Sequence, residues 1–523
     1  MHGWGSRSTN GNENKMQRLW RYPWYTLLLA VYSPLALLAY NAGQVPNSAV
    51  LRSLVVIVAG VLVLTTLVLF SIKDVHKAGL IVTVMLILFF SYGHVYELLA
   101  GTRMAGITIG RHRYLLLVYL LVLVVTIFGV MRSKNSFQQW SSVLMTIAVV
   151  SLIFPVYTLV TYELKAGPPA ASSAQALSVK TSSRENLPDI YYIILDTYGR
   201  TDWLKEYAGY DNSSFIAALQ NLGFYVAECS QSNYAHTGLS LASSLNFDYL
   251  DELGVDFSAS DSKREDLLAP YIKHNAVTDR LRSMGYKIVA FETGYDFTTL
   301  DDTDILYPTA KSGLTDFEIV LLRSTALVYL DDAGAFKGMV ATPLENKRKT
   351  ILSQLETLRD LTSVSDPKFV FAHLLIPHFP YVFDENGNSL IGTNLTESEG
   401  NLTTREYFQG YRGQVTFTSD QLLSIVREIL QESDPDPIII IQGDHGPSHA
   451  GEAARMGILN AYYFPENQNA LLYPDITPVN SFRALFNTYF GTQLDMLPDI
   501  SYFSSKNTPD EATVIPNECG SKK

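Results

Sequence analysis

Long apolar runs dominate the first 164 residues of the chain. Five segments are each about long enough to cross roughly 30 Å of hydrocarbon; they span residues 24–40, 53–72, 78–96, 114–131 and 141–161. Because four apolar segments follow the first, and no small-residue cleavage site is evident, we interpret the first as a membrane anchor and not as a cleaved signal peptide. The pattern predicts a membrane domain of five transmembrane helices over residues 1–164.

Positive charges are distributed unevenly around these segments. One side of the predicted membrane carries Arg7, Lys15, Arg18, Arg21, Lys73, Lys77, Arg132 and Lys134, and the other carries Arg52, Arg103, Arg111 and Arg113. Lysine and arginine accumulate in cytoplasmic loops, so the N-terminus is expected in the cytoplasm. An odd number of spans then places the rest of the chain outside, which predicts a multi-pass protein of the plasma membrane.

A different pattern begins after the last apolar segment. Residues 165–187 are rich in Ala, Ser and Pro and have no apolar period, which is typical of a linker. Beyond it, short β-rich runs alternate with helical stretches. The predicted strands are 188–195, 224–229, 286–293, 368–375 and 437–441, and the predicted helices are 212–222, 274–284, 343–362 and 418–432, the last with Thr418 or Ser419 as N-cap.

Strands that alternate with helices predict an α/β domain over residues 188–523, with a mostly parallel sheet covered on both faces. Burial on both faces explains the unalternated isoleucines of 438–441. The net charge of −12 and the pI of about 5.3 give no basic footprint, so no nucleic-acid partner is expected. Cys229 and Cys519 are the only cysteines; a bridge between them and an inert buried thiol are equally compatible with the sequence.

Ionisable side chains follow three of the predicted strands directly. Asp196 follows the first, His378 follows 368–375, and Asp444 with His445 follows the isoleucine run. Ligands of such sheets gather at the carboxyl ends of strands, and a carboxylate beside an imidazole suits zinc or manganese. The alternatives are structural: Asp196 as the N-cap of a helix, and Asp444 and His445 as parts of an ordinary surface loop.

Thr237 is the candidate nucleophile. It lies in a hydroxyl-rich stretch, residues 232–246, at the expected entry to a helix. A divalent metal would lower the pKa of its hydroxyl, and the N-terminus of the helix would favour a phosphate. The structural alternative is that Thr237 merely caps the helix, and both roles can hold together.

Four motifs in order resemble a known family. LDTYGR, NYAHTGLSLASS, AHLLIPHFPY and GDHG are similar to the sulfatase-like branch of the alkaline phosphatase superfamily. With five membrane spans ahead of them, they resemble most closely the lipoteichoic acid synthases and phosphoethanolamine transferases of bacterial envelopes. The implied architecture is a multi-pass α-helical membrane domain followed by an alkaline-phosphatase-like α/β domain, held by the inner membrane and facing the periplasm.

The resemblance also implies roles for single residues. Asp196, where those transferases usually have Glu, would bind one divalent metal ion, zinc or manganese, together with Thr237, Asp444 and His445; Thr237 would be the metal-bound nucleophile. His378 would have a catalytic role, binding or protonating the phosphate oxygens of the substrate, and His373 would also bind the substrate. Both can serve only if Pro377 breaks the strand, because a separation of five otherwise directs them to opposite faces. His236 is a further candidate for substrate contact. His449 suggests a second metal, but no complete second set of ligands can be assembled.

One departure separates the branches of this family. Sulfatases carry Cys or Ser in a C/S-x-P-x-R pattern, whereas the corresponding run here is Thr237 to Leu241 and lacks both the oxidisable residue and the arginine. The resemblance therefore favours transfer of a phosphoglycerol or phosphoethanolamine group from a membrane phospholipid to an envelope glycan or lipid, through a phospho-threonine. The alternatives are a hydrolase of phosphoesters and a non-catalytic envelope scaffold.

Overall fold

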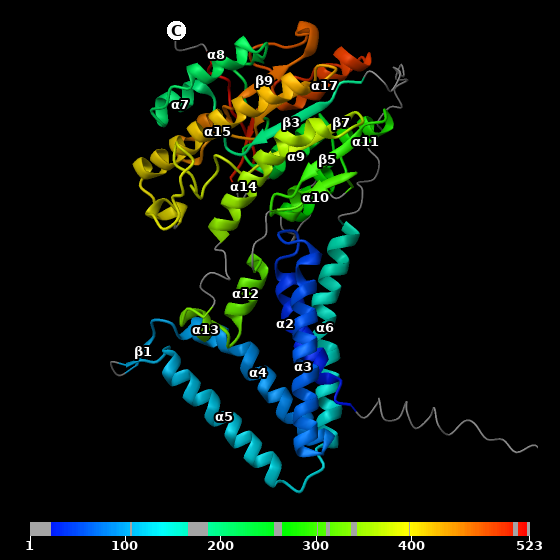
Figure 1. Cartoon of the computed structure of the whole chain (residues 1–523), viewed down its shortest axis with the longest axis vertical. Coiled ribbons are helices and arrows are strands. Elements are labelled where there is room, and N and C mark those ends of the chain that lie inside the picture. The colour runs from blue at the N-terminus through cyan, green and yellow to red at the C-terminus, as the bar shows by residue number, and fades with distance from the viewer. Residues whose placement is uncertain are drawn as a thin grey trace, which may run out of the picture. The chain divides into compact units, whose positions relative to one another are not determined.

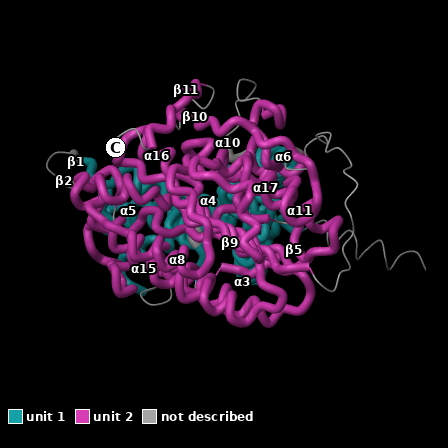
Figure 2. Tube along the Cα trace, turned by 90° about the horizontal axis from the view of Figure 1, so that it is seen from above, with its two compact units in different colours: residues 1–162, 313–340 teal, residues 163–312, 341–523 magenta. Residues whose placement is uncertain are grey.

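The computed structural model of the chain describes residues 22–104, 107–165, 187–255, 264–300, 302–309, 314–335, 343–396, 398–505 and 511–519. It divides into two compact units, shown in Figure 2. Unit 1 comprises residues 1–162 and 313–340, and unit 2 comprises residues 163–312 and 341–523. Residues 166–186, nearly all of the predicted linker, lie outside the described residues, and the predicted boundaries stay predictions.

Unit 1 contains the helices that the apolar segments predict (Figure 1). They are α2 (Tyr25–Tyr40), α3 (Leu51–Ile72), α4 (Val75–Leu99), α5 (His112–Arg132) and α6 (Gln138–Lys165). Among the described residues, four helices are long and apolar enough to cross a membrane, whereas α2 is a shorter apolar helix. The multi-pass membrane domain is therefore confirmed, and the count of five spans stays a prediction.

A second stretch of chain completes unit 1. Helices α12 (Asp316–Ser324) and α13 (Val328–Asp332) pack against the membrane helices, although the flanking sequence belongs to unit 2. Phe317 and Leu321 of α12 share an apolar cluster with Leu38 and Val50, and Asp332 accepts hydrogen bonds from side chains of α4 and α5. The chain thus enters unit 1 twice.

Unit 2 is built around a seven-stranded sheet in the order β4-β9-β8-β3-β7-β5-β6. The strands are β3 (Ile190–Leu195), β4 (Tyr225–Val226), β5 (Lys287–Phe291), β6 (Ile305–Tyr307), β7 (Lys368–Leu374), β8 (Ile438–Gly443) and β9 (Asn460–Tyr463). All neighbours from β8 to β6 are parallel, and β9 pairs antiparallel with β8 and β4. The predicted mostly parallel sheet is confirmed.

Helices cover both faces of this sheet (Figure 1). One face packs against α8 (Ser213–Asn221), α14 (Pro343–Asp360) and α15 (Thr404–Glu432), and the other against α9 (Thr237–Asn246), α11 (Ala276–Ser283) and α17 (Pro478–Phe490). Alternate residues of β8 enter the two cores, Ile439 and Ile441 on one side and Ile438 and Ile440 on the other. Every isoleucine of the run is therefore fully buried, as a strand covered on both faces requires.

One predicted helix start differs in the structure, whereas a helix does begin at Thr237 as predicted. Helix α15 begins fourteen residues before Thr418, where Thr403 and Glu406 form a capping box. Thr418 and Ser419 are buried inside the helix, and their hydroxyls donate to carbonyl oxygens one turn earlier, so neither is an N-cap. Thr237 is the first residue of α9, after the N-cap His236, so it does not cap that helix.

The two cysteines are joined. Cys229 and Cys519 form a disulfide with a Cα–Cα distance of 5.4 Å, which resolves the alternatives left by the sequence. The bridge holds the C-terminal stretch against the loop that follows β4, and Asn517 adds a hydrogen bond to the Cys229 carbonyl.

Candidate active site

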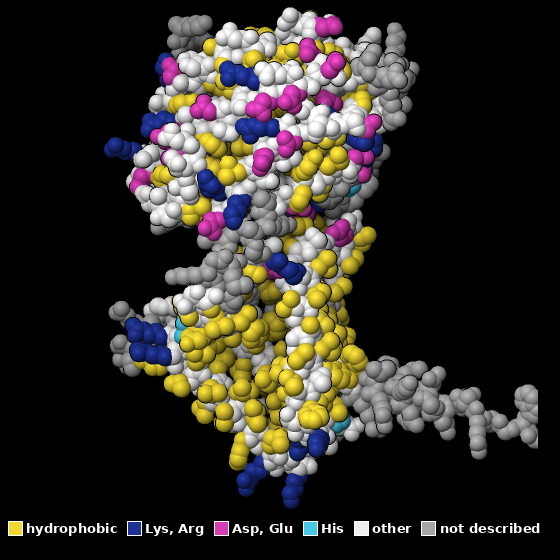
Figure 3. Space-filling model, viewed as in Figure 1, with side chains coloured by type: hydrophobic (Ala, Val, Ile, Leu, Met, Phe, Trp, Pro, Cys, Tyr) yellow, Lys and Arg dark blue, Asp and Glu magenta, His cyan; other side chains and the backbone are white. Residues whose placement is uncertain are grey.

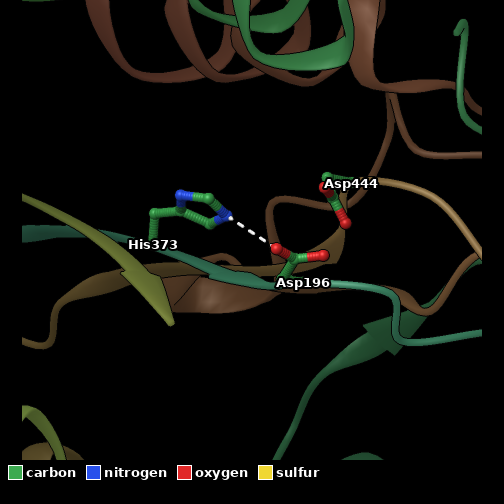
Figure 4. A group of neighbouring side chains, drawn as sticks. All are labelled: Asp196, His373 and Asp444. Carbon is green, nitrogen blue, oxygen red and sulfur yellow. Dashed lines mark ion pairs between the residues drawn. The ribbon is translucent and has the colours of Figure 1, made fainter. Parts of the chain in front are cut away.

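Three buried side chains meet at the carboxyl ends of neighbouring strands (Figure 4). Asp196 follows β3, Asp444 follows β8 and His373 lies near the end of β7. Because β3 pairs with β7 on one side and β8 on the other, its end is flanked by both partners. One ligand atom from each of the three lies within 4.8 Å of those of the other two. The sheet order thus brings together residues that are far apart in the sequence.

His445 and Thr237 join this cluster. The His445 Nε2 atom is 3.2 Å from Thr237 Oγ1, 3.4 Å from Asp444 Oδ2 and 4.0 Å from Asp196 Oδ1. His445 Nδ1 lies 3.0 Å from the Gly446 carbonyl oxygen, to which it can only donate. Nε2 therefore carries the lone pair on the side of the carboxylates, the tautomer that a metal ligand requires.

The backbone around Thr197 fixes the Asp444 carboxylate. Thr197 adopts a left-handed conformation with φ of 72°, which is unusual for a β-branched residue. This conformation directs the Thr197 N–H to Asp444 Oδ1 at 2.8 Å, while the Thr197 carbonyl accepts from the Tyr411 hydroxyl at 2.8 Å. The strained conformation is held by hydrogen bonds at both ends of the residue, as is typical of functional sites.

Several polar atoms of the cluster have no hydrogen-bond partner among the described residues. These atoms are Asp444 Oδ2 and both ring nitrogens of His373, although His373 Nε2 lies 3.7 Å from Asp196 Oδ2. Buried polar groups left unpaired are costly, and two carboxylates so close together repel each other. A divalent cation would relieve both penalties, so the donor set of carboxylates and imidazoles fits zinc or manganese.

His378 lies beyond the end of β7, in a loop fastened by α14 and α15. Its carbonyl accepts from Lys347 Nζ at 2.8 Å and from Gln414 Nε2 at 3.2 Å, and its Nδ1 donates to the Phe379 carbonyl. The strand ends at Leu374, before Pro377. His373 and His378 therefore both line the same cavity of about 670 Å³, as the sequence requires if both serve the site.

The cavity also contains two basic side chains that the sequence did not reveal as site residues. Lys347 and Arg455 line it together with Asp196, Thr237 and His445. Arg455 is held by the carbonyls of Ala235 and Gly446 and by Ser448 Oγ, and its Nη2 lies 3.2 Å from His445 Nε2. Lys347 lies in α14, and Arg455 lies in the short helix α16 (Glu452–Met456); neither helix carries a recognisable motif. The only sequence signal that Arg455 could belong to the site is that it follows His445 of the GDHG motif by ten residues.

The remaining predicted histidines are placed differently. His236 lines the cavity, with Nε2 3.0 Å from the Ser504 carbonyl oxygen, so it lies at the site and is tied to the C-terminal stretch. His449 stacks on Tyr407 with ring centroids 4.1 Å apart and lies near Glu399. Within the described residues it belongs to no cluster of metal-ligating side chains.

Burial and mutual charge set the protonation of the cluster. Burial raises the pKa of Asp196, but the nearby His378, His373 and His445 outweigh burial and hold it well below its usual range. Burial and the Asp196 charge raise the pKa of Asp444 to about 7. Burial lowers the pKa of His378 and lowers that of His445 more strongly. Burial also lowers the pKa of Lys347, to about 7. At neutral pH the two imidazoles are therefore neutral and available as ligand or base.

Comparison with solved structures gives distant likenesses. The C-terminal periplasmic domain of EptC from Escherichia coli is 12% identical, with 68% of this chain and 97% of that chain covered and a TM-score of 0.43. The integral membrane protein lipooligosaccharide phosphoethanolamine transferase A from Neisseria meningitidis is 12% identical, with 88% and 92% covered and a TM-score of 0.39. The phosphonate monoester hydrolase of Agrobacterium radiobacter is 14% identical, with 60% and 80% covered and a TM-score of 0.39.

No family model matches the sequence, and no curated protein matches it.

Proposed function

We propose that the protein is a metal-dependent phosphotransferase of the cell envelope. It would transfer a phospho head group, of the phosphoglycerol or phosphoethanolamine type, from a membrane phospholipid to an envelope glycan or lipid through a phosphorylated Thr237. The unit that carries the site would face the periplasm and be held at the inner membrane by the helices of unit 1.

One observation carries this proposal: the Thr237 hydroxyl lies beside a buried cluster of carboxylates and imidazoles. Its Oγ1 is 3.2 Å from His445 Nε2, and it is the first residue of α9. The positive end of a helix favours a phosphoryl group near this hydroxyl. A threonine that served packing alone would have no need of unpaired carboxylate and imidazole atoms beside it.

Each side chain has a defined task in this chemistry. Asp196, Thr237, Asp444 and His445 would hold the cation, to which His373 also lies close enough to contribute. When bound, a divalent cation supplies positive charge that favours ionisation of a hydroxyl and balances phosphate oxygens. Lys347 and Arg455, which line the cavity, would contact the remaining charge of the phosphate.

The first step would exchange one phosphoester bond for another. Thr237 Oγ1 forms a bond to phosphorus while the bond from phosphorus to the diacylglycerol oxygen breaks. The Thr237 proton would be released to the solvent of the cavity, and the departing diacylglycerol oxygen would take up a proton there, with His378 of the cavity lining as the candidate proton donor. In the second step an acceptor hydroxyl displaces Thr237 and returns its proton by the same route, so the enzyme is regenerated.

Intact-mass spectrometry of the full chain tests the proposal. The purified protein in detergent is incubated with zinc or manganese and, separately, with phosphatidylethanolamine and phosphatidylglycerol. We expect an added mass equal to one phosphoethanolamine or phosphoglycerol group, localised to Thr237 by peptide sequencing. Thr237→Ala should show no added mass, and Ser240→Ala, from the same helix, should retain it.

The same experiment separates the alternatives. Head-group release without an acceptor, at a rate matching turnover, would show a hydrolase instead of a transferase. A protein that binds no stoichiometric metal and gains no mass with either lipid would contradict the proposal and favour a scaffold.

A further inference from the structure

A second cavity lies in unit 1 and shares no lining residue with the cluster just described. It has a volume of about 690 Å³ and is bounded by α3, α4 and the segment that carries α12. Its lining is mostly apolar; the lining residues include Val56, Gly60, Leu64, Leu86, Phe89 and Leu322. Figure 3 shows that hydrophobic side chains also cover the outer surface of the membrane helices. The cavity thus belongs to the part of the protein built for a hydrocarbon environment.

The open volume is created partly by one glycine. A Cβ atom added at Gly60 would meet no other atom within 4 Å, so the helix does not need glycine there for close packing. Glycine also costs about 1 kcal/mol relative to alanine in a helix interior. Its presence in the cavity wall leaves space that any larger side chain would fill.

An ion pair marks the polar end of the cavity. Arg52, at the start of α3, donates from both Nε and Nη2 to the carboxylate of Glu318 in α12. The Arg52 side chain is 58% exposed, whereas that of Glu318 is 8% exposed. Glu318 also accepts from the Thr315 backbone and hydroxyl at the N-cap of α12. The pair therefore fastens α12 where charged groups can reach the membrane interface.

Physical considerations restrict what can occupy the cavity. Water is disfavoured, because a buried water needs two to four polar partners. Apart from Arg52 and Glu318, the lining offers only the hydroxyls of Ser53 and Thr325, and that of Thr325 already donates to the Leu322 carbonyl. A helix of a partner protein, about 10 Å across, would fill this volume in under about two turns. A flexible hydrocarbon chain fits both the apolar walls and the volume, which lies within the range of about 300–1,000 Å³ for ligand pockets.

We propose that this cavity binds one acyl chain of a membrane glycerophospholipid, with the polar end of the lipid at the Arg52–Glu318 pair. The chain would lie along Val56, Gly60 and Leu64 of α3 and be covered by α12. This inference does not depend on the proposed phosphotransferase activity, because every lining residue belongs to unit 1.

Photolabelling from within the bilayer tests the inference. The full chain carrying Thr237→Ala is placed in vesicles of phosphatidylethanolamine and phosphatidylglycerol that contain a phospholipid with a diazirine on one acyl chain. After illumination and digestion, we expect labelling to concentrate on peptides of α3, α4 and α12 that line the cavity. Peptides of α5, whose apolar side chains are exposed, report the background from bulk lipid.

Two glycines provide a matched pair of variants. Gly60→Leu fills the cavity and should reduce labelling of the α12 peptide to the α5 background. Gly129→Leu lies in α5, where an added Cβ also meets nothing within 4 Å, and should leave the labelling unchanged. Val56→Trp, one turn before Gly60 on the same wall, should act like Gly60→Leu. The melting temperature in detergent shows that each variant is folded.

The outcome is decisive in either direction. Labelling of the α12 peptide that persists in folded Gly60→Leu and Val56→Trp, or that never exceeds the α5 background in the starting protein, would overturn the inference. Because Thr237→Ala cannot form the phospho-threonine, neither result bears on the transferase chemistry. Failure of one proposal is therefore distinguishable from failure of the other.

Discussion

Two backbone N–H groups, those of Thr197 and His445, hold one oxygen of the Asp444 carboxylate, Oδ1. Thr197 N–H donates to Oδ1, while Oδ2 has no hydrogen-bond partner among the described residues. Asp444→Asn keeps an oxygen for the Thr197 bond but removes the negative charge. We expect zinc or manganese to bind at least about tenfold more weakly, since metal sites are that sensitive even to changes in supporting groups. Metal titration of the full chain in detergent measures the change.

Asp251→Asn is the matched control, because Asp251 is an exposed carboxylate of unit 2. It should bind metal like the starting protein. Equal metal affinity in Asp444→Asn and Asp251→Asn would show that Asp444 is not a ligand.

Lys347 should make stability depend on pH. Its folded pKa, about 7, lies below the ordinary value of 10.5, so the charged form is disfavoured in the folded protein. Below about 7 this penalty is complete, and it disappears as the pH rises towards 10.5, where Lys347 is neutral in both states. Lys347→Met removes the cost of burying the charged ammonium, and it also removes two hydrogen bonds to carbonyls. Of these two effects, only the cost of the buried charge varies with pH.

Melting temperatures measured with a metal chelator test this expectation. The melting temperature of the starting protein, relative to Lys347→Met, should rise between pH 7 and pH 10. Lys349→Met, two residues away and exposed, should run parallel to the starting protein. A constant difference between the starting protein and Lys347→Met would contradict the lowered pKa.

Single residues of the site were predictable to different degrees. Asp196, Asp444 and His445 follow buried strands, and Thr237 begins a hydroxyl-rich helix, so local sequence signals their positions. Lys347 and Arg455 have no such signal. Lys347 lies among the charges of α14, and only the packing of that helix beside the loop of residues 377–383 brings it to the cavity.

At the level of elements, helix α15 both covers the sheet and fastens the loop of residues 377–383. Gln414 is fully buried; its Nε2 donates to the carbonyls of Pro377 and His378, and its Oε1 accepts from the N–H of Val382 and Phe383. One side chain therefore serves four backbone groups. His378 would depend on it for position.

Gln414→Leu should destabilise unit 2 and slow the chemistry. Each buried backbone group left unpaired costs about 1–3 kcal/mol, so a clear loss of melting temperature is expected. The rate of adduct formation on Thr237 should fall further than in Gln431→Leu, an exposed position in the same helix. A Gln414→Leu protein with the starting rate would show that the loop holds its position without this residue.

Helix α15 also shows why element boundaries were harder to predict than elements. Its first half contains Gly410 and Gly413, which normally weaken a helix, so the sequence favoured a later start. A Cβ at Gly410 would lie 2.2 Å from Tyr381 Cδ2, so glycine is needed there for close packing. Strands β6 and β9 were missed because three or four residues are too few to show a period.

At the level of the whole molecule, neither unit is one continuous stretch of the chain. The segment with α12 and α13 lies between two parts of unit 2 in the sequence, yet it packs in unit 1. Its short amphipathic helices resemble any others in an α/β chain. Only the contacts with α3, α4 and α5 reveal where it belongs, and sequence periodicity carries no information about such contacts.

The division into two units predicts how the whole protein responds to metal. All proposed ligands belong to unit 2, so a cation that binds only the folded state should stabilise that unit alone. At a free concentration about 100 times the dissociation constant, the gain is about 2.7 kcal/mol. Calorimetry of the full chain in detergent should therefore show the unfolding transition of unit 2 moving to higher temperature with zinc, while that of unit 1 stays in place.

The two transitions can be assigned by their response to substitution. Gln414→Leu should lower the unit 2 transition and leave the other unchanged, and Asp444→Asn should abolish the shift caused by zinc. A chelator should reverse the shift in the starting protein, because binding and unfolding are linked through the free metal. A zinc-dependent shift of both transitions, or a shift that survives in Asp444→Asn, would place the stabilising metal outside the cluster of Asp196, Thr237, Asp444 and His445.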